Sequence, residues 1–186
     1  MDGLYYLPLG GTDEIGMNMY LYGYGPEGKQ RWIMVDCGIG FPDEAYAPGV
    51  ETMTPDPEWI AERRDRLDGI FITHAHEDHI GAIGSLYDKL KVPVYCTAFP
   101  AEIARRKLEE VGESPKHITV VEPNGTVKAG KFDVTFFPMT HSVPETSALI
   151  IRTPVGTVFH TADFKIDPDP VYGKPMDKEA LRKLGE

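Results

Sequence analysis

Three histidines and two acidic residues fall within six consecutive positions, residues 74–79, and no other part of the sequence constrains the chain as strongly. The order is His-Ala-His-Glu-Asp-His, with an apolar run before it and a glycine-spaced segment after it. Imidazoles and carboxylates at this density beside a buried strand are costly to desolvate unless a strongly positive charge lies among them. A solvated loop would explain a lone histidine better than it explains this cluster. The pattern therefore predicts a metal site.

The strand and helix expected around the cluster suggest two ions. If a strand ends near Thr73, then His74 and His76 lie two residues apart and can point toward one ion. After the chain turns into the next helix, Asp78 and His79 can face a second ion, which two-metal sites hold roughly 3.5–4 Å from the first. Nitrogen ligands with some carboxylate suit Zn²⁺, so we expect two Zn²⁺ ions, with Mn²⁺ as the alternative.

Two later strand ends carry side chains that would complete such a site. His141 follows an apolar strand pattern at residues 132–137, and Asp163 follows another at residues 157–160. Either residue alone could be a capping or turn residue. Because strand ends on one edge of a sheet converge, His141 can complete a three-histidine set on the first ion, and Asp163 can bridge both ions.

A third acidic position, Asp36, ends a predicted buried strand at residues 32–35 and precedes a glycine by two positions. Aspartate near glycine is often only a turn former. The alternative is that Asp36 reaches the loop at residues 74–79, the metal loop, and hydrogen-bonds a ligand there, as carboxylates behind metal-bound histidines commonly do. The remaining histidines, His117 and His160, are expected to be structural.

Hydrophobic periodicity and turn residues predict a mixed α/β fold (α+β) with two packed sheets flanked by helices. Expected helices cover residues 57–66, 79–90 and 100–111, with a weak helix near the C-terminus. Expected strands are residues 4–9 and 17–22, which form a hairpin, and then 32–35, 69–73, 92–96, 117–121, 132–137, 146–153 and 157–160.

Length and composition indicate one soluble domain. The chain has 186 residues, 41% of them hydrophobic, and no stretch approaches the roughly 18 unbroken apolar residues of a membrane span. The N-terminus lacks the features of a secretory signal. Cys37 and Cys96 stand in apolar contexts, so we expect reduced core thiols, a cytoplasmic location and no membrane partner.

The formal net charge of −10 argues against a polyanionic partner, because nucleic-acid binding normally needs a basic surface. Two divalent ions would weaken this objection, since they would add about four positive charges at the point where a phosphate would bind.

Together the motifs resemble the ribonuclease J family, in the β-CASP group of the metallo-β-lactamase superfamily. Thr12 and Asp13 depart from the small residues that usually precede the segment at residues 14–18 (EIGMN) in that family, and this departure concerns only the shape of the loop. The segments that carry the resemblance are residues 7–11 (LPLGG), 14–18 (EIGMN), 35–38 (VDCG), 72–82 (ITHAHEDHIGA), 140–144 (THSVP) and 160–167 (HTADFKID).

The resemblance implies a metallo-β-lactamase αββα sandwich that hydrolyses RNA phosphodiester bonds through a hydroxide held between two metal ions. It also implies endonucleolytic and 5′-to-3′ exonucleolytic action on mRNA and rRNA precursors, with RNA as partner and a homo-oligomer, dimer or tetramer, in the full-length form. The expected ligands are His74, His76 and His141 on one ion, Asp78 and His79 on the other, and a shared Asp163. Asp36, Asp78 and Asp163 are the expected catalytic carboxylates, and Ser142 is expected to contact the substrate.

Ribonuclease J-like proteins are considerably longer than this chain. A β-CASP domain is inserted into the lactamase domain, the chain then returns to finish the sandwich, and a small C-terminal domain follows. We therefore expect residues 1–186 to be the N-terminal part of a metallo-β-lactamase domain, incomplete at its C-terminal side and with one unpaired sheet edge. A last ligand histidine and a histidine assisting the leaving group have no counterpart here.

Two other functions fit the same residues. One is a small-molecule metallo-hydrolase of the glyoxalase II or lactamase type, which the acidic charge suits. The other is a non-catalytic domain that binds RNA or a partner.

Overall fold

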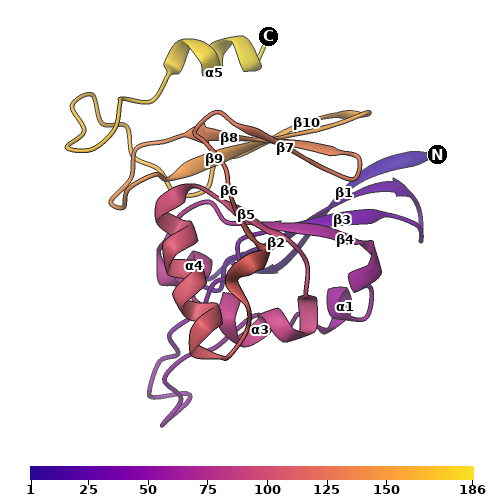
Figure 1. The fold of residues 1–186 in the computed structure, drawn as a ribbon, viewed down its shortest axis with the longest axis vertical. Coiled ribbons are helices and arrows are strands. Elements are labelled where there is room, and N and C mark those ends of the chain that lie inside the picture. The colour runs from indigo at the N-terminus through magenta and orange to yellow at the C-terminus, as the bar shows by residue number, and fades with distance from the viewer.

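Two β-sheets pack face to face in the computed structural model, which describes residues 1–186, and helices lie on the outer face of each sheet (Figure 1). The layers follow the order helix, sheet, sheet, helix, so the predicted αββα sandwich is confirmed.

The larger sheet has six strands in the order β1-β2-β3-β4-β5-β6. The first three pair antiparallel, as the predicted hairpin requires, and β3 to β6 pair parallel. Parallel neighbours need crossover connections, and these connections carry the helices that cover one face of the sheet (Figure 1). The strands are β1 (Asp2–Gly10), β2 (Met19–Pro26), β3 (Arg31–Val35), β4 (Leu67–Phe71), β5 (Val94–Cys96) and β6 (Ile118–Val120).

The smaller sheet is antiparallel throughout, in the order β10-β9-β8-β7. β10 pairs only with β9, and β7 only with β8, so these two strands form the edges of the smaller sheet. The expectation that the sandwich is incomplete on its C-terminal side stays a prediction. The strands are β7 (Thr126–Ala129), β8 (Phe132–Pro138), β9 (Ser147–Thr153) and β10 (Gly156–His160).

Side-chain alternation along β3 explains why this strand is a continuous apolar run. Successive side chains of a strand point to opposite faces. Trp32 and Met34 join the core beneath the helices, whereas Ile33 and Val35 join the core between the two sheets. Across that second core, the rings of Phe71 and Phe136 are 6.1 Å apart. β3 therefore needs apolar residues on both faces.

The helices are α1 (Glu58–Ala61), α2 (Glu77–Ile80), α3 (Ile83–Leu90), α4 (Ala98–Glu110) and α5 (Lys178–Leu184). The last of them forms the fourth layer. Its half-buried Ala180, Leu181 and Leu184 pack against the outer face of the smaller sheet, which presents Phe137 and Ile150. No helix in this fold has the length and the apolar character needed to cross a membrane.

Several helix boundaries differ from those predicted. The helix expected at residues 79–90 is divided into α2 and α3, and α2 starts at Glu77, because the carbonyl of His76 already accepts from the backbone N–H groups of His79 and Ile80. The helix expected at residues 57–66 is a short α1 followed by a 3₁₀ turn.

Two further differences have local causes. α4 starts at Ala98 instead of Pro100, because proline is tolerated in the first turn, where backbone N–H groups lack helical partners. β7 was not predicted, since it is short and only Ala129 in it is buried. Cys37 and Cys96 are buried and unpaired, as expected.

Candidate metal centre

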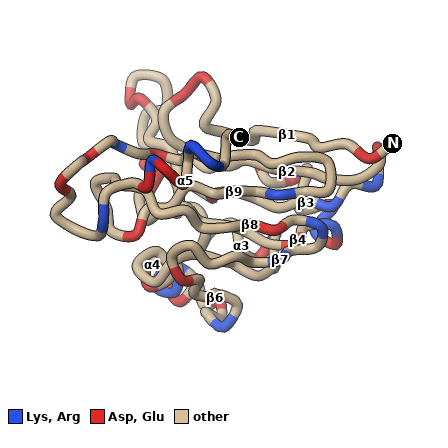
Figure 2. The backbone as a smooth tube through the Cα atoms, turned by 90° about the horizontal axis from the view of Figure 1, so that it is seen from above, with Lys and Arg blue, Asp and Glu red and all other residues tan.

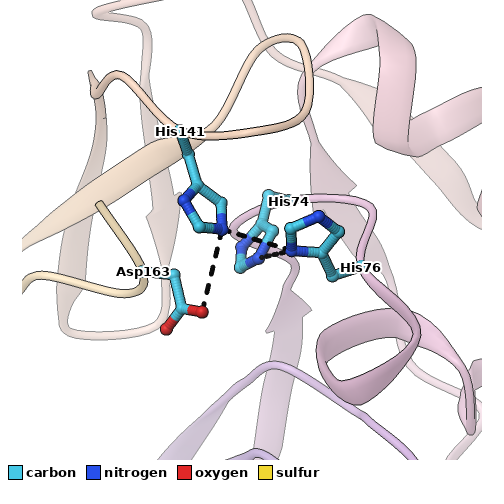
Figure 3. Close-up of side chains that lie close together, drawn as sticks. All are labelled: His74, His76, His141 and Asp163. Carbon is cyan, nitrogen blue, oxygen red and sulfur yellow. Dashed lines mark hydrogen bonds and ion pairs between the residues drawn. The ribbon is translucent and has the colours of Figure 1, made fainter. Parts of the chain in front are cut away.

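The predicted ligands come from loops at the ends of strands in both sheets. His74 and His76 follow β4, His141 follows β8, and Asp163 follows β10. One ligand atom from each of these four residues lies within 4.8 Å of the others (Figure 3). The packing of the two sheets thus brings together residues that are far apart in the sequence.

The nitrogen atoms are spaced as ligands of one ion would be. Nε2 of His74 and Nε2 of His141 each lie 3.2 Å from Nδ1 of His76. Two nitrogens bound tetrahedrally to Zn²⁺ at 2.0–2.1 Å would be about 3.3 Å apart. Oδ2 of Asp163 lies 3.7 Å from Nε2 of His141. The spacing of the three imidazoles, with the carboxylate beside them, is therefore compatible with binding of one zinc ion.

A second group shares the same carboxylate. Nε2 of His79 lies 3.6 Å from Oδ2 of Asp163 and 3.6 Å from Oδ2 of Asp78. Asp163 is thus placed between the three-histidine group and the pair formed by Asp78 and His79. All six residues predicted as metal ligands lie together at this edge of the sandwich.

Asp36 lies behind the centre. Its side chain is fully buried, and Oδ2 accepts a hydrogen bond of 2.8 Å from Nδ1 of His79. Oδ1 accepts a hydrogen bond from the backbone N–H of Thr73. The φ of Asp36 is +61°, in the left-handed region that aspartate tolerates better than most residues. The strand end therefore turns its carboxylate toward the metal loop.

Burial differs across the centre. His74 and His79 are 0% and 2% exposed, whereas His76 and His141 are half-buried and Asp163 is exposed. The interior side of the centre is consequently fixed by packing. The side that carries Asp163 is open to solvent, as a site for a large substrate must be.

The electrostatics favour a cation. Burial, with a smaller effect from nearby His79, lowers the pKa of His74 to about 3, so this imidazole is neutral at pH 7. Contact with His79 lowers the pKa of Asp163 to about 2. Burial opposes ionisation of Asp36, but the nearby histidines, mainly His79, together outweigh burial and lower its pKa. His74 is thus neutral and Asp163 ionised, the states in which these groups bind metals.

Neighbouring backbone holds the metal loop in place. The carbonyl of His79 accepts from the N–H of Cys37, and the carbonyl of Asp78 accepts from the N–H of Asn18. Gly38 packs so closely that a Cβ on it would lie 1.6 Å from the carbonyl oxygen of Asp78. The segments at residues 16–18 and 37–39 therefore fix the positions of Asp78 and His79.

Sequence reasoning missed Asn18 and Thr73. The side-chain amide of Asn18 lies 3.0 Å from the carbonyl oxygen of Asp78 and 3.1 Å from Nε2 of His79. The only signal for Asn18 was its place in a segment that carries the family resemblance. Ser142 was expected to contact the substrate; its Oγ lies 3.1 Å from Nε2 of His76, and its contact with substrate stays a prediction.

The two histidines expected to be structural lie outside the centre. Nδ1 of His160 is 2.9 Å from the hydroxyl of Tyr22. The ring of His117 lies 6.0 Å from that of Tyr87, on the helical side of the larger sheet.

Comparison with known proteins supports this assignment of the fold. A family model described as a β-lactamase superfamily domain matches residues 31–178. The ribonuclease J of Sinorhizobium meliloti is 47% identical over 98% of this chain and 32% of its own length. Those of Mycolicibacterium smegmatis and Thermus thermophilus are 40% and 36% identical, over 99% and 96% of this chain and 32% of their own lengths. The chain thus spans about a third of the length of these relatives.

Solved structures show the same fold. A protein described as of unknown function from Enterococcus faecalis aligns with a TM-score of 0.57 and 18% identity, over 88% of this chain and 44% of its own. The metallo-β-lactamase fold protein YhfI from Bacillus subtilis aligns with a TM-score of 0.55 and 23% identity, over 85% of this chain and 61% of its own.

Proposed function

The chain belongs to the β-lactamase superfamily, and on that basis we propose that it is the metal-binding part of a ribonuclease that hydrolyses RNA phosphodiester bonds. The observation that carries the proposal is the meeting of three histidines with Asp163 at one edge of the sandwich. The identity of 47% to a ribonuclease J supports RNA as the substrate. The proposed action is endonucleolytic and 5′-to-3′ exonucleolytic, in RNA maturation and decay.

Six residues of this chain would hold two divalent ions, Zn²⁺ or alternatively Mn²⁺. Bound there, the ions would lower the pKa of water from about 15.7 toward about 7 and neutralise charge on the phosphate oxygens. We assign His74, His76 and His141 to one ion, Asp78 and His79 to the other, and Asp163 to both.

The carboxylates of the chain have separate tasks in this proposal. Asp163 is ionised and exposed, so its oxygens can accept a hydrogen bond from an attacking water molecule. Asp36 is buried and holds Nδ1 of His79, which leaves Nε2 of that ring directed at Asp78 and Asp163. Ser142 is placed beside His76, where it can orient that ring as well as contact substrate.

The acidic composition is compatible with RNA as the substrate. The formal net charge is −10, and lysine and arginine occur in separate stretches interspersed with acidic residues (Figure 2). Attraction for a phosphate would therefore come from the ions and not from a basic surface. We expect RNA binding by this chain to depend on metal.

The remaining proposals rest on the family. Because the chain spans about a third of its relatives' length, we propose that it forms the N-terminal part of a metallo-β-lactamase domain. The longer protein is proposed to be a cytoplasmic homo-oligomer, dimer or tetramer, with RNA as partner. The buried, unpaired Cys37 and Cys96 are consistent with a reducing compartment.

The test compares His74→Ala with His117→Ala, a matched change of a histidine outside the centre. We expect the purified protein to hold two ions per chain and to cleave 5′-monophosphorylated RNA only when they are present. His74→Ala should keep the fold by circular dichroism, hold fewer ions, and lose at least about 100-fold in turnover, because several kcal/mol of transition-state stabilisation depends on them.

His117→Ala should behave as the unchanged protein. Metal-dependent RNA cleavage that survives His74→Ala would contradict the proposal. Cleavage of a thioester but not of RNA would instead indicate a small-molecule hydrolase. Fewer than two ions per chain in the unchanged protein would fit a non-catalytic binding domain and also the missing counterpart of the family's last ligand histidine.

A further inference from the structure

Thr73 lies at the junction between β4 and the metal loop and contacts groups on both sides of the centre. Its side chain is fully buried. Its Oγ1 lies 3.0 Å and 2.9 Å from the two carboxylate oxygens of Asp36, and 2.9 Å from Nδ1 of His74. This hydroxyl therefore connects Asp36, which contacts His79, to His74 of the three-histidine group.

The direction of these hydrogen bonds follows from the number of protons available. A hydroxyl has one proton to donate, and a carboxylate can only accept. If the hydroxyl donated to His74, its lone pairs would face both oxygens of Asp36 in a buried site, which costs the desolvation of unpaired acceptors. The hydroxyl of Thr73 must therefore donate to Asp36 and accept from His74.

This direction determines the tautomer of His74. Because Nδ1 carries the proton that Thr73 accepts, the lone pair of the ring is on Nε2. Nε2 is the atom that lies 3.2 Å from Nδ1 of His76, inside the group of converging ligands. His79 follows the same rule, since its Nδ1 donates to Oδ2 of Asp36 and its Nε2 faces Asp78 and Asp163.

We propose that Thr73 is a positioning residue that extends the influence of Asp36 to His74, so that one buried carboxylate sets the tautomer of a histidine in each half of the metal centre. Asp36 acts on His79 directly and on His74 through the hydroxyl of Thr73. The inference rests on the proposed metal centre but not on RNA as the substrate.

The test uses Thr73→Val, which removes the hydroxyl at nearly constant shape, and Thr73→Ser, which keeps it. Thr135→Val is the control, because the hydroxyl of Thr135 bonds to Thr126 and Arg152, away from the centre. Long-range ¹H–¹⁵N spectra of histidine-labelled protein report which ring nitrogen carries the proton. Titration with Zn²⁺ alone reports affinity without any catalytic assay.

In the metal-free protein we expect His74 to carry its proton on Nδ1, and Thr73→Ser and Thr135→Val to keep this tautomer. Thr73→Val should lose the preference and bind Zn²⁺ about 10- to 100-fold more weakly, the usual cost of losing a group that orients a ligand. Recovery by serine separates the hydroxyl from the packing of the side chain.

Three results would overturn the inference. They are a proton on Nε2 of His74 in the unchanged protein, a Thr73→Val variant with unchanged tautomer and zinc affinity, and a Thr73→Ser variant no better than valine. Should Thr73→Val fail to fold, the tautomer of His74 in the unchanged protein and in Thr73→Ser still tests the inference. A protein that binds Zn²⁺ but does not cleave RNA would reject the proposed function and leave this inference standing.

Discussion

His79 lies close to three carboxylates, those of Asp36, Asp78 and Asp163. Burial alone would lower its pKa, but Asp36, Asp163 and Asp78 together raise the pKa to about 10. Without metal, both ring nitrogens of His79 therefore carry a proton at neutral pH, and the ring is positively charged. A metal ion that binds Nε2 must displace that proton, because only the neutral ring is a ligand.

We predict that zinc binding releases about one proton per chain from His79 at pH 8. The release should disappear as the pH rises through about 10, where His79 loses its proton without metal. Apparent zinc affinity should accordingly increase about tenfold per pH unit between pH 7 and 9. Calorimetric titrations in two buffers with different ionisation enthalpies measure the release, and identical heats in both would disprove it.

Gly38 is required for close backbone contact. A side chain there would overlap the carbonyl oxygen of Asp78, and both groups belong to backbone that cannot rotate away. We predict that Gly38→Ala displaces residues 77–79, weakens zinc binding and destabilises the fold by about 1–3 kcal/mol or more. Urea unfolding and zinc titration measure both effects.

Gly185→Ala is the matched control for that change, because its Cβ would meet no atom closer than 3.6 Å. It should leave both stability and zinc affinity unchanged. Equal behaviour of the two variants would mean that the approach of Gly38 to the metal loop is not tight.

Among the elements, the core between the two sheets and the outer helix α5 contribute unequally to stability. Phe136 on β8 is fully buried between the sheets, whereas Leu181 on α5 is only half-buried. We predict that Phe136→Ala lowers the free energy of unfolding by about 3–5 kcal/mol and Leu181→Ala by about 1 kcal/mol. Urea denaturation of the metal-free protein measures both, and a larger loss for Leu181→Ala would reverse the expected order.

The boundaries of the helices were predicted less well than their buried faces. The periodicity of residues 79–90 located the apolar face of α3 correctly, since Ile83, Leu86, Tyr87 and Leu90 are buried. It did not reveal that the helix is interrupted after Ile80. That break depends on hydrogen bonds from the metal loop to the segment after β3, which come from distant parts of the chain.

At the scale of the whole molecule, the metal centre connects the two sheets. His74 and His76 follow a strand of the larger sheet, and His141 and Asp163 follow strands of the smaller one. Ions bound by all four would therefore oppose separation of the sheets. Binding to the folded state alone adds about 2.7 kcal/mol when the free ion is 100-fold above its Kd.

We predict that a chelator lowers the unfolding temperature by about 5–10 °C, from about 2–4 °C for each kcal/mol in a chain of this size. Differential scanning calorimetry with Zn²⁺ and with excess chelator measures the shift. His74→Ala should show a much smaller shift, and His117→Ala the full one. An equal shift for both variants would place the stabilising ion elsewhere.

The donor chemistry and the general architecture could be predicted from the amino-acid sequence. Imidazoles and carboxylates in residues 74–79, with His141 and Asp163 at later strand ends, predicted a metal centre at one edge of a two-sheet sandwich, because these features depend on composition and local periodicity. Which nitrogen each ring directs at the centre, such as Nδ1 of His76, and which groups hold the ring became clear only from the three-dimensional fold. Ring orientation is set by hydrogen bonds between residues far apart in the chain, and no local pattern encodes them.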